Sequence, residues 1–228
     1  MPLNHQLHRP PYKRTVEDKY SDNWAGAVLV GTGYNSVTAE FTVPTPSAPP
    51  GGNSSSEESY CAAAWVGIDG DTCETAILQS GVNFCVKGSE VSFNAWYEWY
   101  PEDQYTLDLA ISAGDVVKVT VMTSNVSSTA TIENTTTDKS AIYTFANTRH
   151  DPLCEYNAEW IVEDFKINNN SFVPFADFGT VTFSSASAGT TSGDTVGPAD
   201  ATLFNIIQEN GLLTSVSVTE DSVTVTYI

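Results

Sequence analysis

The chain has 228 residues, of which 28 are Asp or Glu and only nine are Lys or Arg, so its formal net charge is −19 at pH 7. The phosphates of nucleic acid would repel such an acidic chain, which excludes a nucleic-acid partner. The sequence contains no run of about 18 apolar residues, which excludes a membrane-spanning helix. Because repulsion among carboxylates relaxes when they are protonated, we expect a protein that works in acid.

Residues 1–14 differ in charge from the rest of the chain. They contain Arg9, Lys13 and Arg14 and no acid, whereas the segment from Thr15 onward holds all 28 acids against six bases (nine minus three), a balance of −22. The dibasic pair Lys13–Arg14 stands where the composition changes. We therefore expect residues 1–14 to be the remainder of a propeptide, with an ordinary basic arm as the alternative, and residues 15–228 to form one domain.

Short runs rich in Val, Thr, Ile, Tyr, Phe and Trp, bounded by Gly, Pro, Asn, Asp and Ser, are typical of β-strands. They occur at 24–31, 36–44, 63–70, 75–84, 91–101, 107–123, 129–136, 140–146, 159–165, 179–188 and 212–228. This pattern predicts an all-β fold, a single antiparallel β-sandwich. Residues 199–211 predict a short helix or an irregular segment. Residues 44–59, rich in Pro, Gly and Ser, predict a flexible surface loop, the kind of segment that proteases nick.

The cysteines and glycosylation sequons favour a secreted protein. Four Cys in an acidic, Ser/Thr-rich chain suit an oxidising compartment and two disulfides, for which three connectivities are open. Asn-x-Ser/Thr sequons occur at Asn53, Asn125, Asn134 and Asn169.

Several predicted strands carry aromatic and acidic or amide side chains on one face, because alternate residues of a strand point the same way. The sets that share a face are Trp65 with Asp69, Gln79 with Asn83, Trp96 with Glu98 and Tyr100, and Glu163 with Phe165. Such faces predict a concave groove that grips an extended polymer. The alternative is that the aromatic side chains form core and the acids cap sheet edges.

Glu163 stands out because it lies in an apolar, aromatic strand. Desolvation beside Phe165 would raise the pKa of the Glu163 carboxyl and keep it protonated in acid, fit to donate a proton. Glu159 has the same strand parity and could equally be a charge on the groove rim.

Most other hydrolytic chemistries are excluded by missing residues. Beyond residue 14, His150 is the only histidine, and the sequence has no GxSxG, HExxH, P-loop or dinucleotide motif. We therefore expect no metal and no cofactor. The two Asp-Thr/Ser-Gly loops of aspartic peptidases are also missing. Carboxylate chemistry remains, in a glycosidase with two acids or in a peptidase that uses acids and water.

Five stretches, SDNWAGAVL (21–29), AAWVGIDGDTCETAILQSGV (63–82), NAWYEWYPE (94–102), NAEWIVEDF (157–165) and VPFADFG (173–179), are similar to motifs of the eqolisins, the fungal glutamic peptidases. The resemblance runs from about Tyr20 to Ile228. It implies two bent antiparallel sheets of the concanavalin A-like lectin/glucanase type with a substrate groove on the concave side. It also implies secretion as a zymogen and pepstatin-insensitive endopeptidase activity in acid.

The same resemblance implies roles for individual residues. The catalytic pair falls on Gln79 and Glu163, with Glu163 as general acid and base on a water and Gln79 stabilising the oxyanion. Substrate-binding positions fall on Trp24, Trp65, Asp69, Trp96, Glu98 and Tyr100, to which the strand faces add Phe165. The implied disulfides are Cys73–Cys154 and Cys61–Cys85. Asn83 departs from family members that carry Asp there.

The resemblance further implies a polypeptide substrate and cleavage within 44–59 into a two-chain form, and we expect a monomer. Two rival functions stay open at this point. One is a β-sandwich glycoside hydrolase that uses Glu98 and Glu163 as its two carboxylates. The other is a non-catalytic, lectin-like binding module.

Overall fold

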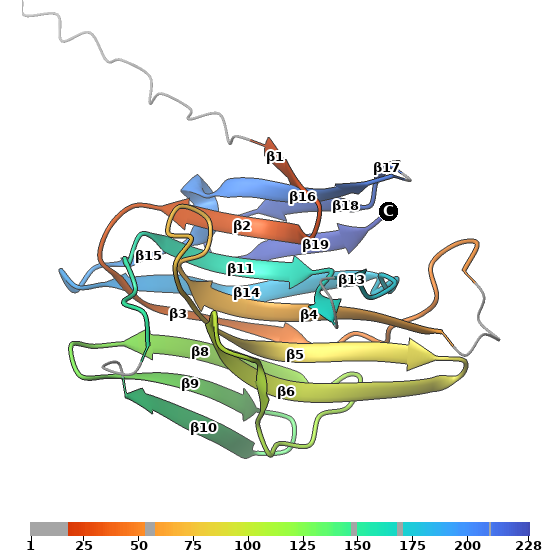
Figure 1. Cartoon of the computed structure of the whole chain (residues 1–228), viewed down its shortest axis with the longest axis horizontal. Helices are drawn as coiled ribbons and strands as arrows, with labels where there is room; N and C mark the ends of the chain where they lie inside the picture. Colours follow the sequence, from red (N-terminus) through yellow and green to blue (C-terminus); the bar gives the residue numbers. More distant parts are fainter. Residues whose placement is uncertain (1–17, 53–57, 147–149, 168–170, 210) are drawn as a thin grey trace, which may run out of the picture.

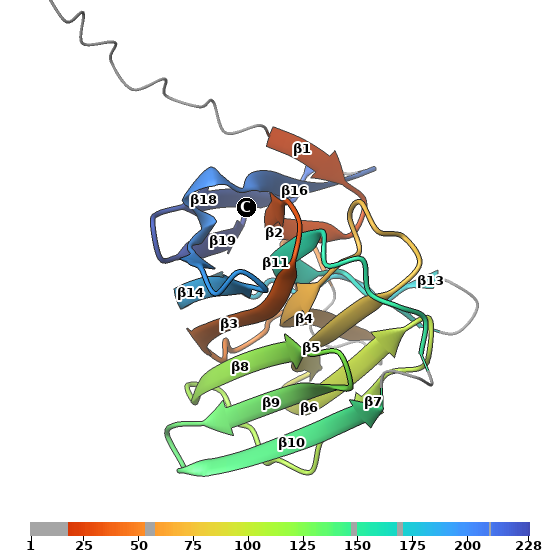
Figure 2. The ribbon, with the colours of Figure 1, turned by 90° about the vertical axis from the view of Figure 1, so that its left-hand side faces the viewer.

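The computed structural model describes residues 18–52, 58–146, 150–167, 171–209 and 211–228 (Figure 1). These residues form two large β-sheets packed face to face, and Figure 2 views the two layers from the side. Within the described part of the chain there is no α-helix, and the one short helix is the 3₁₀ turn η2 (Pro198–Asp200). The predicted all-β antiparallel sandwich is confirmed.

The first sheet has nine strands and carries the site discussed below. Its order across the sheet is β1 (Asp18–Ser21), β16 (Thr202–Gln208), β2 (Trp24–Val30), β11 (Asn157–Glu163), β4 (Ser59–Ile68), β5 (Ile77–Lys87), β6 (Glu90–Tyr100) and β7 (Tyr105–Thr106), with β17 (Gly211–Leu212) paired to β16. All of these pairs are antiparallel except β1 with β16.

The second sheet has eight strands. Its order is β10 (Lys139–Ala146), β9 (Ser127–Asn134), β8 (Val116–Thr123), β3 (Tyr34–Thr42), β14 (Thr180–Thr190), β19 (Val223–Tyr227) and β18 (Thr214–Val218), with β15 (Thr195–Val196) paired to β14. A separate two-stranded pair is formed by β12 (Lys166–Ile167) and β13 (Ser171–Phe172).

The main hydrophobic core lies between the sheets and comes from one face of each strand. On β11, Ala158, Trp160 and Val162 point into this core, while Ile161 joins a second, smaller cluster on the other face of the nine-stranded sheet. That second cluster contains Val28, Ala63, Trp65, Trp96, Ile161 and Phe204, with Trp24 and Phe165 packed against it. The first sheet is therefore apolar on both faces along its central strands, which is why β4 is buried throughout most of its length.

Two element predictions are wrong. Residues 199–211 contain η2 followed by strand β16, which pairs with β1 and β2 from the other end of the chain. These partners are remote in sequence, so the local pattern did not predict the strand. In the run 107–123, only Val116–Thr123 is a strand, because residues before it form a turn in which Asp115 accepts a hydrogen bond from the Ser112 amide at 2.9 Å.

The loop at 44–59 is partly tied down. Ser47 and Asp177 exchange backbone hydrogen bonds at 2.8 and 2.9 Å, which fixes the first part of the loop to the segment after β13. Residues 53–57 and the predicted propeptide remnant, residues 1–14, lie outside the described residues. Within the described ranges, no helix has the length and apolar character needed to cross a membrane.

Candidate active site

A groove of about 900 Å³ lies on the face of the nine-stranded sheet that carries the smaller cluster. Its lining comes from the β1–β2 turn, from β4, β5 and β6, from the loop after β6, and from the end of β11. Six acids and a single base line it: Asp71, Glu74, Glu98, Glu102, Asp103 and Glu163, with Lys166. The groove therefore concentrates carboxyl groups on one face of the sheet.

The register of four adjacent strands explains why polar residues remote in sequence share the groove face. One row across β11, β4, β5 and β6 reads Glu159, Gly67, Gln79, Glu98, and a parallel row four residues along reads Glu163, Ala63, Asn83, Asn94. The row between them reads Ile161, Trp65, Gly81, Trp96.

Glycine at two of these positions makes room for the Trp65 side chain. A Cβ at Gly81 would lie 2.2 Å from the Ala64 carbonyl oxygen and 2.6 Å from the Trp65 Cβ. A Cβ at Gly67 would lie 2.9 Å from the Trp65 ring. The indole can therefore pack against Gly67 while its Nε1 reaches Glu163.

Glu163 receives a hydrogen bond on each carboxylate oxygen. The Trp65 indole Nε1 donates to Oε2 at 2.9 Å, and the Asn23 side-chain Nδ2 donates to Oε1 at 3.0 Å. Burial raises the pKa of the Glu163 carboxyl, and hydrogen bonds from Trp65, Trp24 and Asn23, with the charge of Lys166, partly oppose that rise. The direction expected from the sequence is confirmed, with burial as its main cause.

Gln79 lies in the same groove, paired with Glu98. Its side-chain Nε2 donates to Glu98 Oε2 at 2.6 Å, while its Oε1 is buried without a partner. Burial raises the pKa of Glu98 to about 7, repulsion by Glu163 adds to the rise, and the hydrogen bond from Gln79 opposes it. A protonated Glu98 can also donate, so this pair fits together in either protonation state of the acid.

The aromatic residues predicted to bind substrate occupy different depths. Trp24 and Phe165 line the groove and are half-buried, and Trp96 lines it from below, only 2% exposed. Trp65 is fully buried and packs edge-on against Trp24 with ring centroids 5.1 Å apart, so it supports the groove floor. Tyr100 lines the rim and is 45% exposed.

Asp69 is not on the groove, contrary to the prediction from strand alternation. β4 ends at Ile68, and Asp69 follows with a positive φ of 68°, which turns its side chain off the groove face. Asp69 is 0% exposed, and its carboxylate accepts hydrogen bonds from three consecutive backbone amides, those of Glu155, Tyr156 and Asn157, at 2.9, 2.7 and 3.2 Å. The proposed substrate contact is therefore wrong, and Asp69 instead holds the segment that leads into β11.

Glu159 is also placed differently from one of its expected roles. It is 0% exposed, so a rim charge is wrong. Burial raises the pKa of Glu159 well above its ordinary value, and the neighbouring carboxyls of Asp71 and Asp69 add to the rise. Burial thus favours the neutral form of this carboxyl.

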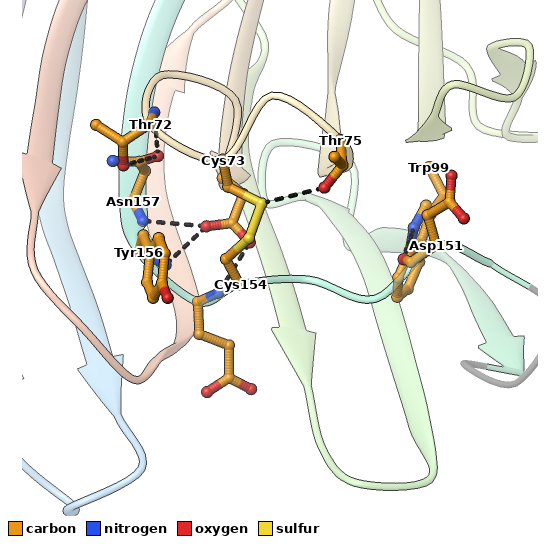
Figure 3. The surroundings of a disulfide bond; sticks show 10 residues. Thr72, Cys73, Thr75, Trp99, Asp151, Cys154, Tyr156 and Asn157 are labelled. Atoms are coloured by element: carbon orange, nitrogen blue, oxygen red, sulfur yellow. Dashed lines mark hydrogen bonds between the residues drawn. A yellow bond between two sulfur atoms is a disulfide. The ribbon is translucent and has the colours of Figure 1, made fainter.

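Both disulfides implied by the family resemblance are present, Cys61–Cys85 and Cys73–Cys154. Cys61 and Cys85 are directly opposite each other on β4 and β5. Figure 3 shows the Cys73–Cys154 disulfide, which joins the loop before β5 to the segment before β11. In the same loop, the backbone amide and the hydroxyl of Thr72 donate to Asn157 Oδ1 at 2.8 and 3.1 Å. The strands of Gln79 and Glu163 are thus linked covalently as well as through β4.

Sequence reasoning missed several residues of the site. Ser21 and Asn23 form the turn before β2, and Phe204 comes from the unpredicted strand β16. Lys166 lines the groove beside Glu163. The SDNW motif contains Ser21 and Asn23, but nothing local in the sequence indicates that Asn23 reaches Glu163, 140 residues away.

Comparisons with known proteins agree on one family. The model of the Peptidase A4 family matches residues 22–227. Aspergillopepsin-2 of Aspergillus niger is 54% identical over 94% of this chain and 80% of its own length, and Scytalidopepsin B of Scytalidium lignicola is 40% identical over 97% and 85%.

Comparison with solved structures supports the same family. A crystal structure of scytalido-glutamic peptidase with a peptide-based transition state analogue matches with a TM-score of 0.80 and 40% identity, covering 91% of this chain and 98% of that one. Aspergilloglutamic peptidase from Aspergillus niger matches with a TM-score of 0.70 and 57% identity, covering 74% of this chain and 99% of that one. The chain therefore belongs to the Peptidase A4 family, the eqolisins, and is a glutamic peptidase.

Proposed function

We propose that this protein is a secreted endopeptidase that hydrolyses polypeptides in acid with Glu163 and Gln79 as its catalytic pair. The observation that carries the proposal is the Glu163 carboxyl, which is half-buried and lines the groove, with its pKa raised and an N–H donor on each oxygen. The chain that carries it is 54% identical to Aspergillopepsin-2. Gln79 lines the same groove from β5.

In the proposed reaction Glu163 transfers one proton from water to the leaving nitrogen, in two steps. Its carboxylate takes a proton from a water molecule, whose oxygen attacks the peptide carbonyl carbon. The carboxyl then gives that proton to the departing nitrogen as the C–N bond breaks. A raised pKa favours this sequence because it makes the carboxylate a stronger base for the first transfer. The donors Asn23 and Trp65 keep the group oriented in both states.

Gln79 supplies the oxyanion contact in this proposal. A carboxamide has two N–H donors, and Gln79 directs one to Glu98. The second N–H is then free to donate to the negative oxygen of the tetrahedral intermediate. The loss of one such donor typically costs a factor of about 100 to 1000 in rate. Glu98 acts in this scheme by fixing the Gln79 amide, while Trp24, Trp96, Tyr100 and Phe165 contact the substrate chain.

The remaining proposals concern maturation. The oxidised cysteines and the family membership support secretion, and the dibasic pair Lys13–Arg14 supports removal of residues 1–14. We also propose that the protein is a monomer and that a protease can cut within 44–59 to give two chains, which Cys61–Cys85 would not join because both cysteines follow the cut. Pairing of β2 with β11 and β16, and of β3 with β8 and β14, would hold them together instead.

Replacing Glu163 by Gln tests the catalytic proposal. Glu163→Gln keeps the side-chain shape but cannot exchange a proton, so cleavage of an acid-denatured protein, followed by mass spectrometry of the peptides, is expected to stop. Glu133→Gln removes an exposed carboxyl on β9 in the other sheet and is the matched control. Substantial cleavage by Glu163→Gln with an unchanged melting temperature would refute the assignment.

Two further assays address Gln79 and the rival functions. Gln79→Glu places a carboxyl beside Glu98 and removes the donor, so it is also expected to inactivate the enzyme. The family assignment decides against the glycoside hydrolase and the lectin-like module. A soluble glucan incubated under the same acid conditions should accordingly stay intact while the protein substrate is cleaved.

A further inference from the structure

A chain of hydrogen bonds leads from Ser21, in the turn between β1 and β2, through the Asn23 side chain to Glu163. The Ser21 Oγ accepts hydrogen bonds from the backbone amides of Asn23 and Trp24, at 3.2 and 3.1 Å. The same Oγ lies 3.1 Å from the Asn23 side-chain Oδ1, and the Asn23 Nδ2 lies 3.0 Å from Glu163 Oε1. Ser21 and Asn23 are thus connected by hydrogen bonds to a carboxyl 140 residues from Asn23 in the sequence.

The Ser21 hydroxyl determines which way the Asn23 amide faces. A hydroxyl has two lone pairs and one proton. Two backbone N–H groups occupy the lone pairs of Ser21, so its proton is the donor toward Asn23. The Asn23 atom that faces Ser21 must then be the carbonyl oxygen, and the NH₂ group must face Glu163, although an asparagine amide could otherwise be turned by 180°.

The Asn23 backbone adds a second constraint. Its main-chain carbonyl oxygen accepts a hydrogen bond from the Asp164 backbone amide at 2.9 Å. Asn23 is therefore hydrogen-bonded to both Glu163 and Asp164. On the other side of the carboxyl, Trp65 donates from an indole N–H, which cannot accept a proton. Each Glu163 oxygen is therefore bonded to a group that only donates.

We propose that Ser21 and Asn23 are positioning residues for Glu163, in which the Ser21 hydroxyl locks the Asn23 amide as a permanent donor to Oε1. This inference rests on the proposed role of Glu163 as the proton carrier. Since neither Asn23 nor Trp65 can take the proton of Glu163, the carboxyl exchanges it only with the groove, where water and substrate lie.

The electrostatic surroundings of Glu163 define what else affects its proton affinity. The charged or titratable groups that interact with it are Lys166 of β12, Glu98 of β6, Glu159 of the same strand, and the adjacent Asp164. Lys166 also forms an ion pair with Asp22 of the turn at 3.9 Å. The proposed substitutions at Ser21 and Asn23 replace none of these five side chains. A shift in pH dependence on changing the turn therefore reports the lost hydrogen bond.

Removing the Asn23 amide provides the main test. Asn23→Ala is expected to lower kcat about 10- to 100-fold, the usual effect of a lost hydrogen bond to a charged group, with little change in KM. The pH profile of kcat/KM is expected to move to higher pH, because the N–H that favours the carboxylate is gone. Unchanged kcat per folded molecule and an unmoved profile would overturn the proposal.

Variants of Ser21 keep the proposal testable if Asn23→Ala unfolds. Ser21→Ala frees the amide to turn and is expected to give a smaller shift in the same direction, while Ser21→Thr keeps the hydroxyl and should restore the wild-type profile. Ser47→Ala removes an exposed, hydrogen-bonded hydroxyl outside the groove and is the control. If Ser21→Ala and Ser21→Thr give the same pH profile of kcat/KM, the proposed role of the Ser21 hydroxyl in orienting Asn23 is refuted.

The proposed function and this inference fail in different ways. An active Glu163→Gln enzyme would refute the catalytic role of Glu163. An inactive Glu163→Gln enzyme together with a wild-type pH profile for Asn23→Ala would leave that role in place and refute only the positioning role of the turn.

Discussion

The Asp164 carboxyl makes a quantitative prediction about stability. Asp164 is 1% exposed; the Gln208 side-chain amide donates to its Oδ2 at 2.7 Å, and its Oδ1 is buried without a partner. Burial raises the pKa of Asp164 from 3.8 to about 7. Repulsion by Glu163 adds to this rise, and the Gln208 hydrogen bond opposes it.

The sign of the effect on stability follows from these values. In the unfolded chain Asp164 ionises near its ordinary pKa of 3.8, whereas in the folded protein it stays protonated up to about pH 7. Between these limits the folded state binds more protons, so stability falls as the pH rises. The shift of about three units corresponds to a loss of about 4 kcal/mol between pH 4 and pH 7. The whole unfolding free energy of a typical domain is only about 5–15 kcal/mol.

Asp164→Asn removes the titration while it keeps a side-chain oxygen that can accept the hydrogen bond from Gln208. Urea unfolding with intact disulfides, followed by tryptophan fluorescence at a series of pH values, measures the difference. We expect the wild-type protein to lose about 4 kcal/mol more than the variant between pH 4 and pH 7. The exposed carboxyl of Asp108 provides the control Asp108→Asn. If Asp164→Asn follows the wild-type curve, Asp164 is ionised in the folded protein and the reasoning is wrong.

Three further predictions concern other parts of the molecule. Asp69→Asn deprives backbone amides of a charged acceptor and should lower the unfolding free energy by about 2–3 kcal/mol in urea titrations; an unchanged midpoint would contradict its structural role. Replacing Cys73 and Cys154 together by Ser opens a loop with a sequence separation of 81 and should cost about 4 kcal/mol, measured in the same way against the wild type. In a secreting yeast host, Asn125, which is exposed, should carry glycan, whereas Asn134, which is 0% exposed and donates hydrogen bonds within the sandwich, should not. A glycopeptide at Asn134 from folded protein would refute that distinction.

The sequence allowed the strands and the groove face to be predicted where alternation was regular. In β11 the inward face of Ala158, Trp160 and Val162 and the opposite parity of Glu163 follow directly from the two-residue period of a strand. The apolar β4 and β5 were likewise predicted as strands. These features depend on local pattern, so no knowledge of distant partners was needed.

The wrong and the missing predictions have two physical causes. Parity holds only while the chain stays extended, and it gave the wrong face for Asp69 because the strand ends one residue earlier. Other features depend on contacts between remote segments. Burial of Glu159, formation of β16 between β1 and β2, and the reach of Asn23 to Glu163 all require the assembled sheet, and no local pattern encodes them.

The proposed preference for acid depends on particular side chains. The net charge of −19 is a weak argument, since exposed charges are screened by salt and each contributes little. Among the described residues, the carboxyls with raised pKa values are instead Glu98, Glu155, Glu159, Glu163 and Asp164, all on or next to strands of the groove-bearing sheet. Burial is the largest cause of each shift.

One structural cause therefore has two consequences. Burying carboxyls beside the groove raises the proton affinity of Glu163, which the proposed chemistry needs, and it also makes the same sheet lose stability as its acids ionise. A change that relieved the burial of Glu163 would extend stability toward neutral pH but would make the carboxylate a weaker base. Activity and the upper pH limit of the fold should consequently move in opposite directions in variants of this groove.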